Sequence, residues 1–182
     1  MKNERSSLYL TVEKLSPIEK EWVAAFEGSD PARMIRTLYE IRNAGSTKIL
    51  PFLFGFIHRK TDPGVRNEIL KLLSEIKSQE AVPLIAASLD KNDFGDYLPA
   101  FVAACWQSGL DFSKHLRVFA GLFIQADYRT ALEAFTVIEE SIPNAAENEI
   151  VDCIRFLRDA ECIVTDEKLP LFRELRKVVE RG

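Results

Sequence analysis

The chain has few of the residues from which metal centres and hydrolytic active sites are usually built. Its 182 residues include three cysteines and two histidines, His58 and His115. Cys105, Cys153 and Cys162 are odd in number and form no Cys-x-x-Cys pair, which predicts reduced, mostly buried thiols. Neither histidine has cysteines or acids at ligand spacing, and a metal site needs three or four convergent ligands. We therefore predict no metal and no cofactor.

Glycine-rich motifs are also missing. The eight glycines are scattered, with no phosphate-binding loop, no Gly-x-Ser-x-Gly elbow and no His-Glu-x-x-His pair. Adjacent acids such as Glu139 and Glu140 point about 100° apart on a helix, so they cannot converge on one substrate atom. Cys153 has no histidine in its own or the preceding hairpin, and burial would raise its pKa. We predict no catalytic residues.

Long apolar runs and alternating strand patterns are absent as well. The start, residues 1–7, is polar and is followed by no long apolar run, which predicts neither a signal peptide nor a membrane anchor. We therefore expect a cytoplasmic protein. Hydrophobic residues at 47% and charged residues at 29% are typical of a globular chain, and the length suits one domain.

What the chain does have is a repeated helical pattern. Residues 62–66 read Asp-Pro-Gly-Val-Arg, in which Asp62 can cap a helix and Pro63 suits its first turn because a missing N–H is no loss there. Two apolar ladders follow, one per helix: Ile69, Leu72, Leu73 and Ile76, then Val82, Ile85 and Leu89. A 34-residue step carries five of these landmarks forward, from Asp62, Ile76, Val82, Ile85 and Leu89 to Asp96, Leu110, Leu116, Phe119 and Phe123. A backward step of 32 residues reaches a second Asp-Pro pair, Asp30 and Pro31.

A period of about 30 to 35 residues with two helices per unit is the signature of an α-solenoid. The Asp-Pro-x-Val-Arg start, the Glu75-Ile76-Lys77 end of the first helix and the Ala81-Val82-Pro83-Leu84 start of the second resemble the short bacterial HEAT repeats. The resemblance is good over residues 62–90 and weaker elsewhere. It implies an all-α, armadillo-like fold, a right-handed α–α superhelix of about four hairpins plus terminal helices. It also implies that Arg66 pairs with acids of the turn or of a neighbouring repeat.

We expect ten helices, over residues 17–27, 31–43, 47–59, 63–77, 79–90, 96–108, 112–125, 128–141, 147–163 and 168–181. Residues 1–182 form a single domain, with an N-terminal cap at 1–29, repeats at 30–163 and a C-terminal capping helix at 164–182. The first helix starts with Ser16, Pro17 and Glu19, the pattern of a capping box.

Charge is unevenly distributed along the chain, whose net charge is −4. Between Arg33 and Lys77 there are nine cations and four acids, whereas between Asp127 and Lys168 there are eleven acids and four cations. We therefore expect an electrically bipolar molecule. The simpler interpretation is that these charges belong to solvated helix faces.

In HEAT-like solenoids the second helix of each hairpin lines the concave side, so the resemblance implies a partner-binding face made of residues off the core stripe of those helices. They are Phe52, Phe56, Leu84, Ser88, Arg117, Val118, Leu122, Ile154, Arg155 and Arg158. If exposed, this row would suit an amphipathic helix or an extended peptide. The alternative is that these side chains are core, because solenoid helices are contacted on three sides.

The sequence is compatible with two alternative functions from different classes. The first is a noncatalytic protein-protein interaction adaptor or scaffold, or a permanent subunit of a larger complex. The second is a nucleic-acid-binding enzyme similar to the HEAT-like DNA glycosylases that remove alkylated bases, with Trp22 and Trp106 as stacking residues and the basic stretch as a phosphate-binding surface. The net charge and the acidic second half argue against the enzyme. We expect an unidentified protein partner, no nucleic acid, no membrane, and a monomer or weak homodimer.

Overall fold

The computed structural model describes residues 15–28, 30–57, 61–91 and 94–182. Within these ranges the chain forms ten α-helices and no β-strand, so the predicted all-α class is confirmed. The helices are α2 (Pro17–Glu27), α3 (Pro31–Ala44), α4 (Leu50–Phe54), α5 (Pro63–Glu75), α6 (Val82–Lys91), α7 (Leu98–Ser108), α8 (Leu116–Gln125), α9 (Tyr128–Ser141), α10 (Glu147–Ala160) and α11 (Leu169–Arg181). No helix in the described ranges is both long and apolar enough to cross a membrane.

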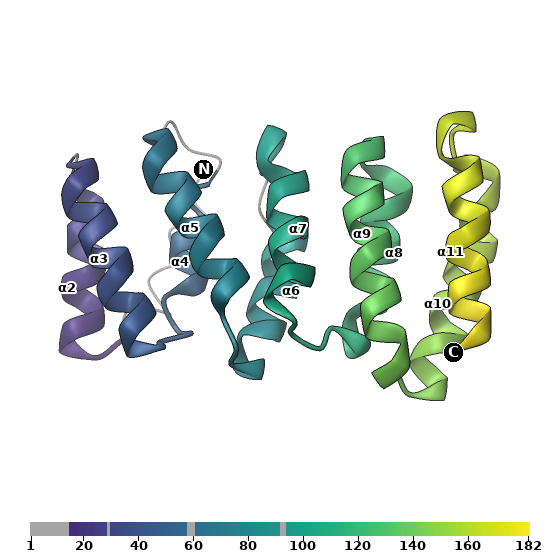
Figure 1. Ribbon diagram of the computed structural model, residues 1–182, viewed down its shortest axis with the longest axis horizontal. Helices are drawn as coiled ribbons and strands as arrows, with labels where there is room; N and C mark the ends of the chain where they lie inside the picture. The colour runs from purple at the N-terminus through teal and green to yellow at the C-terminus, as the bar shows by residue number, and fades with distance from the viewer. Residues whose placement is uncertain (1–14, 29, 58–60, 92–93) are drawn as a thin grey trace.

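The helices lie in two rows that follow the order of the chain along the long axis of the molecule (Figure 1). In one row α3, α5, α7, α9 and α11 each contact the next, and in the other α4, α6, α8 and α10 do the same. Helix α2 packs against α3 at one end, and α10 packs against α11 at the other. The basic stretch 33–77 therefore lies toward the α2 end, and the acidic stretch 127–168 toward the α11 end.

The helices that contact each other most between the two rows are not the two helices of each hairpin predicted from the sequence. The closest pairs are α2 with α3, α8 with α9, and α10 with α11, whereas the repeat pattern joins 96–108 with 112–125 and 128–141 with 147–163. Only Ala126 and Asp127 separate α8 from α9, which forces these two helices to turn back on each other. Helix α2, from the segment predicted as the N-terminal cap, packs against α3, and α11, predicted as the C-terminal capping helix, packs against α9 and α10.

Local hydrogen bonds explain where several helices begin. The Oδ1 atom of Asp30 accepts from the Ala32 N–H at 3.0 Å, Asp62 Oδ1 accepts from the Gly64 N–H at 2.8 Å, and Asp127 Oδ1 accepts from the Thr130 N–H at 2.8 Å. These bonds satisfy N–H groups that have no partner inside the helix. The Asp-Pro starts act as predicted.

The capping box at the start of α2 is also confirmed. The Ser16 N–H donates to Glu19 Oε2 at 2.8 Å, and Ser16 Oγ accepts from the Glu19 N–H. The Ser46 hydroxyl, from the loop after α3, donates to Glu19 Oε1 at 2.6 Å. The hydrogen bonds from Ser46 and then Ser16 lower the pKa of the Glu19 carboxyl below its ordinary value.

Helix α4 is shorter than the predicted 47–59, and Asp96 does not cap a helix. After Phe54 the backbone bonds tighten, with the Phe56 N–H donating to the Leu53 carbonyl and the Ile57 N–H to the Phe54 carbonyl, so the α-helix ends before Gly55. Asp96 lies inside a 3₁₀ turn, Gly95–Tyr97, and α7 begins at Leu98. Similar 3₁₀ turns, Gln79–Ala81 and Ser113–His115, precede α6 and α8.

Packed aromatic rings join helices of the two rows, and single cations join neighbouring segments along the first row. Phe54 and Phe101 meet edge to face at 5.0 Å, and Phe101 stacks on Phe94 at 4.2 Å. Arg42 on α3 forms ion pairs with Glu68 and Glu75 on α5, at 3.4 and 2.7 Å. The guanidinium of Arg66, for which the resemblance implies acidic partners, lies 4.2 Å from the centroid of the Tyr97 ring ahead of α7.

Candidate functional site

The predicted binding residues lie on helices α4, α6, α8 and α10 or, in the case of Phe56, in the turn that follows α4. We call the surface of this row the α4–α10 face. The structure divides its predicted members into three groups according to exposure: buried, half-buried and exposed. Phe56 and Ser88 are buried, Phe52, Leu84, Val118, Leu122 and Ile154 are half-buried, and Arg117, Arg155 and Arg158 are exposed.

Phe56 belongs to the core. Its side chain is 8% exposed, and its ring lies 5.2 Å from Phe26 on α2 and 5.1 Å from Phe52 on α4. Phe52 completes this cluster at 6.1 Å from Phe26. These three rings hold α2 against α4, so a partner could reach Phe56 only by opening the core. The accessible surface of the α4–α10 face therefore excludes Phe56, and Phe52 presents only part of its ring.

Half-buried apolar side chains lie along the α4–α10 face. Phe52, Val118, Leu122 and Ile154 pack against the core while keeping part of their surface accessible, and Leu84 is half-buried in the same row. Because α6 contacts α8 and α8 contacts α10, the aliphatic surface of these helices is carried by successive neighbours. Covering this surface with a partner removes apolar area from water, which favours binding by about 25 cal/mol per Å².

Three arginines border this aliphatic surface at the α8 and α10 end. The guanidinium of Arg117 lies 4.8 Å from the centroid of the Phe156 ring, which ties α8 to α10. Arg155 Nη1 lies 3.4 Å from Asp152 Oδ1, one turn earlier on α10. Ion pairs as exposed as this one hold their side chains weakly.

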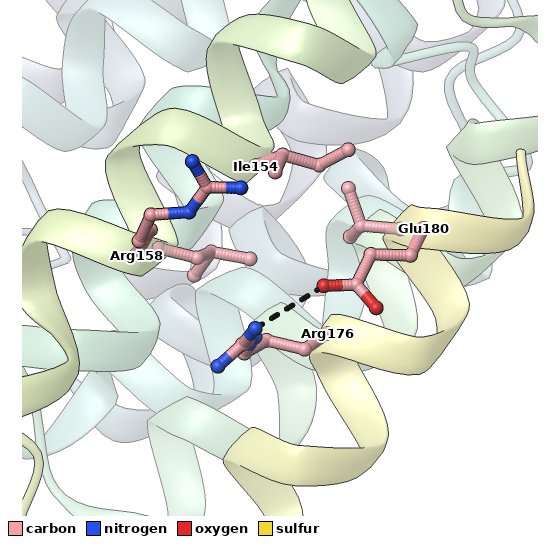
Figure 2. A pocket seen from close by; sticks show the side chains of 6 residues that line it. Ile154, Arg158, Arg176 and Glu180 are labelled. Carbon is pink, nitrogen blue, oxygen red and sulfur yellow. Dashed lines mark hydrogen bonds and ion pairs between the residues drawn. The ribbon is translucent and has the colours of Figure 1, made fainter.

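Arg158 lies at the seam between α10 and α11. Figure 2 shows Ile154 and Arg158 from α10 opposite Arg176 and Glu180 from α11. Arg176 bridges the seam through its ion pair with Glu161, in the turn after α10, at 2.9 Å, and it pairs with Glu180 on its own helix at 3.3 Å. The seam leaves no room for a water molecule. It is a closed joint rather than a ligand pocket.

The two tryptophans do not form a common surface. They lie on α2 and α7, with α3 and α5 between them in the stack (Figure 1). The Trp22 Nε1–H donates to Glu40 Oε2 at 3.1 Å, and the Trp106 Nε1–H donates to Glu133 Oε2 at 2.8 Å. Trp22 is buried and Trp106 is partly exposed. Each indole thus joins its helix to an acid of the next helix in the first row.

The three cysteines and His115 differ in burial. Cys105 and Cys153 are buried and Cys162 is exposed. Burial raises the pKa of the Cys153 thiol to about 11, which outweighs the opposing effect of Arg117. Burial also lowers the pKa of His115, although Glu149 partly offsets this effect. Among the described residues no cluster of three or more His, Cys, Asp or Glu could hold a metal ion. His58 lies outside the described residues.

One surface was missed by the sequence reasoning. A groove of about 320 Å³ opens between α2 and α3, lined by Glu21, Trp22, Ala25, Arg33, Arg36, Thr37 and Glu40. The buried side chains of Trp22, Ala25 and Thr37 form its floor, while the four charged residues are exposed. Arg33 and Arg36 open the basic stretch, but the sequence alone does not show that α2 supplies a second wall.

The fold and its surfaces define an all-helical protein built from serially packed helices. Comparison of the chain with protein-family models, with curated protein sequences and with solved structures gives no match.

Proposed function

We propose that the protein is a noncatalytic interaction module, an α-solenoid of the HEAT-repeat type with a right-handed superhelix, whose α4–α10 face binds a protein partner. The observation that supports this proposal most directly is the half-buried aliphatic surface on α6, α8 and α10, bordered by Arg117, Arg155 and Arg158. The serial packing of the helices along both rows supports the solenoid interpretation, because solenoid units contact only their neighbours.

The chemistry of the face defines its partner. Aliphatic side chains such as Leu84, Val118 and Leu122 favour apolar residues, and the guanidinium groups favour carboxylates, which they can bind with two parallel hydrogen bonds. An amphipathic helix or extended segment that carries both apolar and acidic side chains fits these requirements. Phe56 takes no part, because its contacts with Phe26 and Phe52 place it in the core.

The proposal is tested by affinity capture from lysate of the native organism, with quantitative mass spectrometry of the bound proteins. The bait variant carries Arg117→Glu, Arg155→Glu and Arg158→Glu, whose side chains are all exposed. The matched control carries Arg129→Glu, Arg173→Glu and Arg181→Glu, which make the same charge change on α9 and α11. A tenfold loss of binding corresponds to about 1.4 kcal/mol.

We expect the wild type and the control to capture at least one protein in about equal amounts. The face variant should capture about tenfold less of that protein, or less still. Circular dichroism checks that all three baits are folded. If the folded face variant captures the same proteins in the same amounts as the wild type, the α4–α10 face is not the binding surface.

A further inference from the structure

The groove between α2 and α3 opens away from the rest of the stack. On α3, Ile35 and Arg42 face α5: Ile35 reaches toward Gly64, and Arg42 pairs with Glu68 and Glu75. At 100° per residue, Arg33, Arg36, Thr37 and Glu40 lie on the other side of the same helix. The groove therefore lies at the end of the molecule formed by α2 and α3, which are coloured purple to dark blue in Figure 1.

The charges around this groove are separated into a basic end and an acidic end. The Trp22–Glu40 hydrogen bond places the middle of α2 beside the later part of α3, so Glu21 and Glu40 lie near each other. Arg36 and Arg33 lie nearer the start of α3, about 6 Å and about 10 Å from Glu40 along the helix axis. None of these four charged groups forms an ion pair with any other residue that the structure describes.

The opposite end of the molecule is different. At the α10–α11 seam, Arg176 pairs with Glu161 and Glu180, and on the same helix Lys177 pairs with Glu174 at 2.7 Å. That seam is closed, whereas the α2–α3 groove remains open. Arg176 and Lys177 are thus paired with acids of this chain, whereas no ion pair among the described residues engages the four charges that line the groove.

We propose that the α2–α3 groove is the interface of a homodimer, in which two copies of the chain meet end to end about a two-fold axis. The two-fold axis lies in the plane of the interface and runs perpendicular to the helices at the middle of the groove. It therefore reverses the helix direction and places the basic end of one groove against the acidic end of the other. Arg33 and Arg36 of each copy then oppose Glu40 and Glu21 of its mate. A two-fold interface must be self-complementary in this way. The lining carries two cations and two anions, so the pairing leaves no net charge in the interface.

The dimer is weak and sensitive to salt. Helices of 11 and 14 residues present an end surface of roughly 400 Å², about half of what each partner buries in a stable complex. The four charges are exposed, so added salt screens their attraction. Dimerisation doubles the number of α4–α10 faces in the particle, but it does not depend on what those faces bind.

The experiment is sedimentation equilibrium of the full chain, with three charge variants, at about 0.05 M and about 0.5 M salt. One variant carries Arg33→Glu and Arg36→Glu, which makes the groove wholly acidic. The second carries Glu21→Lys and Glu40→Lys, which makes it wholly basic. The control carries Arg173→Glu and Arg181→Glu, the same charge change as the first variant at the exposed surface of α11.

At low salt we expect the wild type and the control to approach twice the monomer mass of 20.7 kDa as the concentration rises, with at least about tenfold weaker association at high salt. Each groove variant alone stays monomeric, and an equimolar mixture of the two associates, because opposite charges again face each other. Circular dichroism verifies the fold of every variant.

Three results would overturn the proposal. The wild type could remain monomeric at low salt up to about 1 mM, a concentration at which even weak specific interfaces associate. The groove variants could each associate as well as the wild type. Finally, a mixture of the two folded groove variants could stay monomeric, which would exclude the pairing of basic and acidic ends.

Discussion

The Nζ atom of Lys168 lies 2.6 Å from the carbonyl oxygen of Ile124, a residue 44 positions earlier in the chain. The same ammonium group donates to the carbonyls of Phe123 and Ala126, both at 3.0 Å. The last carbonyls of an α-helix have no partner inside the helix, so Lys168 caps α8 from a turn that leads into α11. Lys168 is 4% exposed, although its side chain is cationic.

Replacing Lys168 with methionine should destabilise the protein by about 2 to 4 kcal/mol, because three charge-assisted hydrogen bonds are lost and the carbonyls at the end of α8 remain buried. Urea denaturation measures the change in the free energy of unfolding. Lys177→Met, which removes an exposed lysine on α11, serves as the control and should leave stability nearly unchanged. Equal effects of the two substitutions would show that the cap contributes nothing.

Phe56 tests whether the second-row aromatic residues are core. Phe56→Ala should cost about 3 to 5 kcal/mol, because it removes a buried ring that contacts Phe26 and Phe52. Val151→Ala, at a side chain that is 44% exposed on α10, should change stability by less than about 0.5 kcal/mol. The comparison uses thermal or urea unfolding. A stable Phe56→Ala protein would return this residue to the binding face.

His115 should make the protein less stable in mild acid. Burial lowers its pKa in the folded state from 6.5, so below that pH the unfolded chain binds more protons than the folded one. Stability therefore falls as the pH drops from 6.5 toward the lowered folded-state value. The free energy of unfolding is measured between about pH 7.5 and 5.5, above the range in which most carboxyls titrate. In His115→Gln this slope should become shallower, and an unchanged slope would assign it to other groups.

Two glycines should respond in opposite directions to substitution by alanine. Gly109 ends α7 with φ +67°, a left-handed conformation, so Gly109→Ala should destabilise the protein by about 1 kcal/mol. Gly121 lies within α8, and a Cβ there meets no atom within 4 Å, so Gly121→Ala should stabilise the protein by about 0.5 to 1 kcal/mol. Differential scanning calorimetry measures both changes as shifts of the unfolding temperature, downward for Gly109→Ala and upward for Gly121→Ala. Shifts in the same direction would contradict the assigned conformations.

The three cysteines should differ in reactivity. In the folded protein an aromatic disulfide reagent at pH 8 should titrate one thiol, that of exposed Cys162, while Cys105 and Cys153 stay protected by burial. The raised pKa of Cys153, about 11, further reduces its thiolate fraction. In denaturant all three should react. Rapid modification of two or more thiols in the native state would show that the core opens.

The positions of the helices could be predicted because they depend on local chemistry. Asp30, Asp62 and Asp127 bond to N–H groups two or three residues ahead, and the apolar ladders repeat at helical spacing. The same reasoning failed at Asp96, which lies in a 3₁₀ turn, and it overestimated the length of the helix around Phe54. At both places the backbone adopts tighter i→i−3 bonds that the apolar spacing does not distinguish from an α-helix.

The surfaces were harder to predict, because a residue off the main apolar stripe can still be covered by another helix. Phe52 and Phe56 both lie off the main apolar stripe of the same segment, yet Phe56 is buried against a ring of α2 while Phe52 keeps part of its surface. The α2–α3 groove exists because Trp22 and Glu40, 18 residues apart, are brought together.

The sequence by itself determined that this chain is helical, where most of its helices begin and end, and which stripe of each helix is apolar. These features follow from hydrogen bonds and side-chain periodicity within a few residues. The tertiary structure alone decided how the helices pair across the rows, that Lys168 is a buried cap, and that the N-terminal groove carries a separated pair of charges. Each of these depends on groups 18 to 45 residues apart in the chain, which only packing brings into contact.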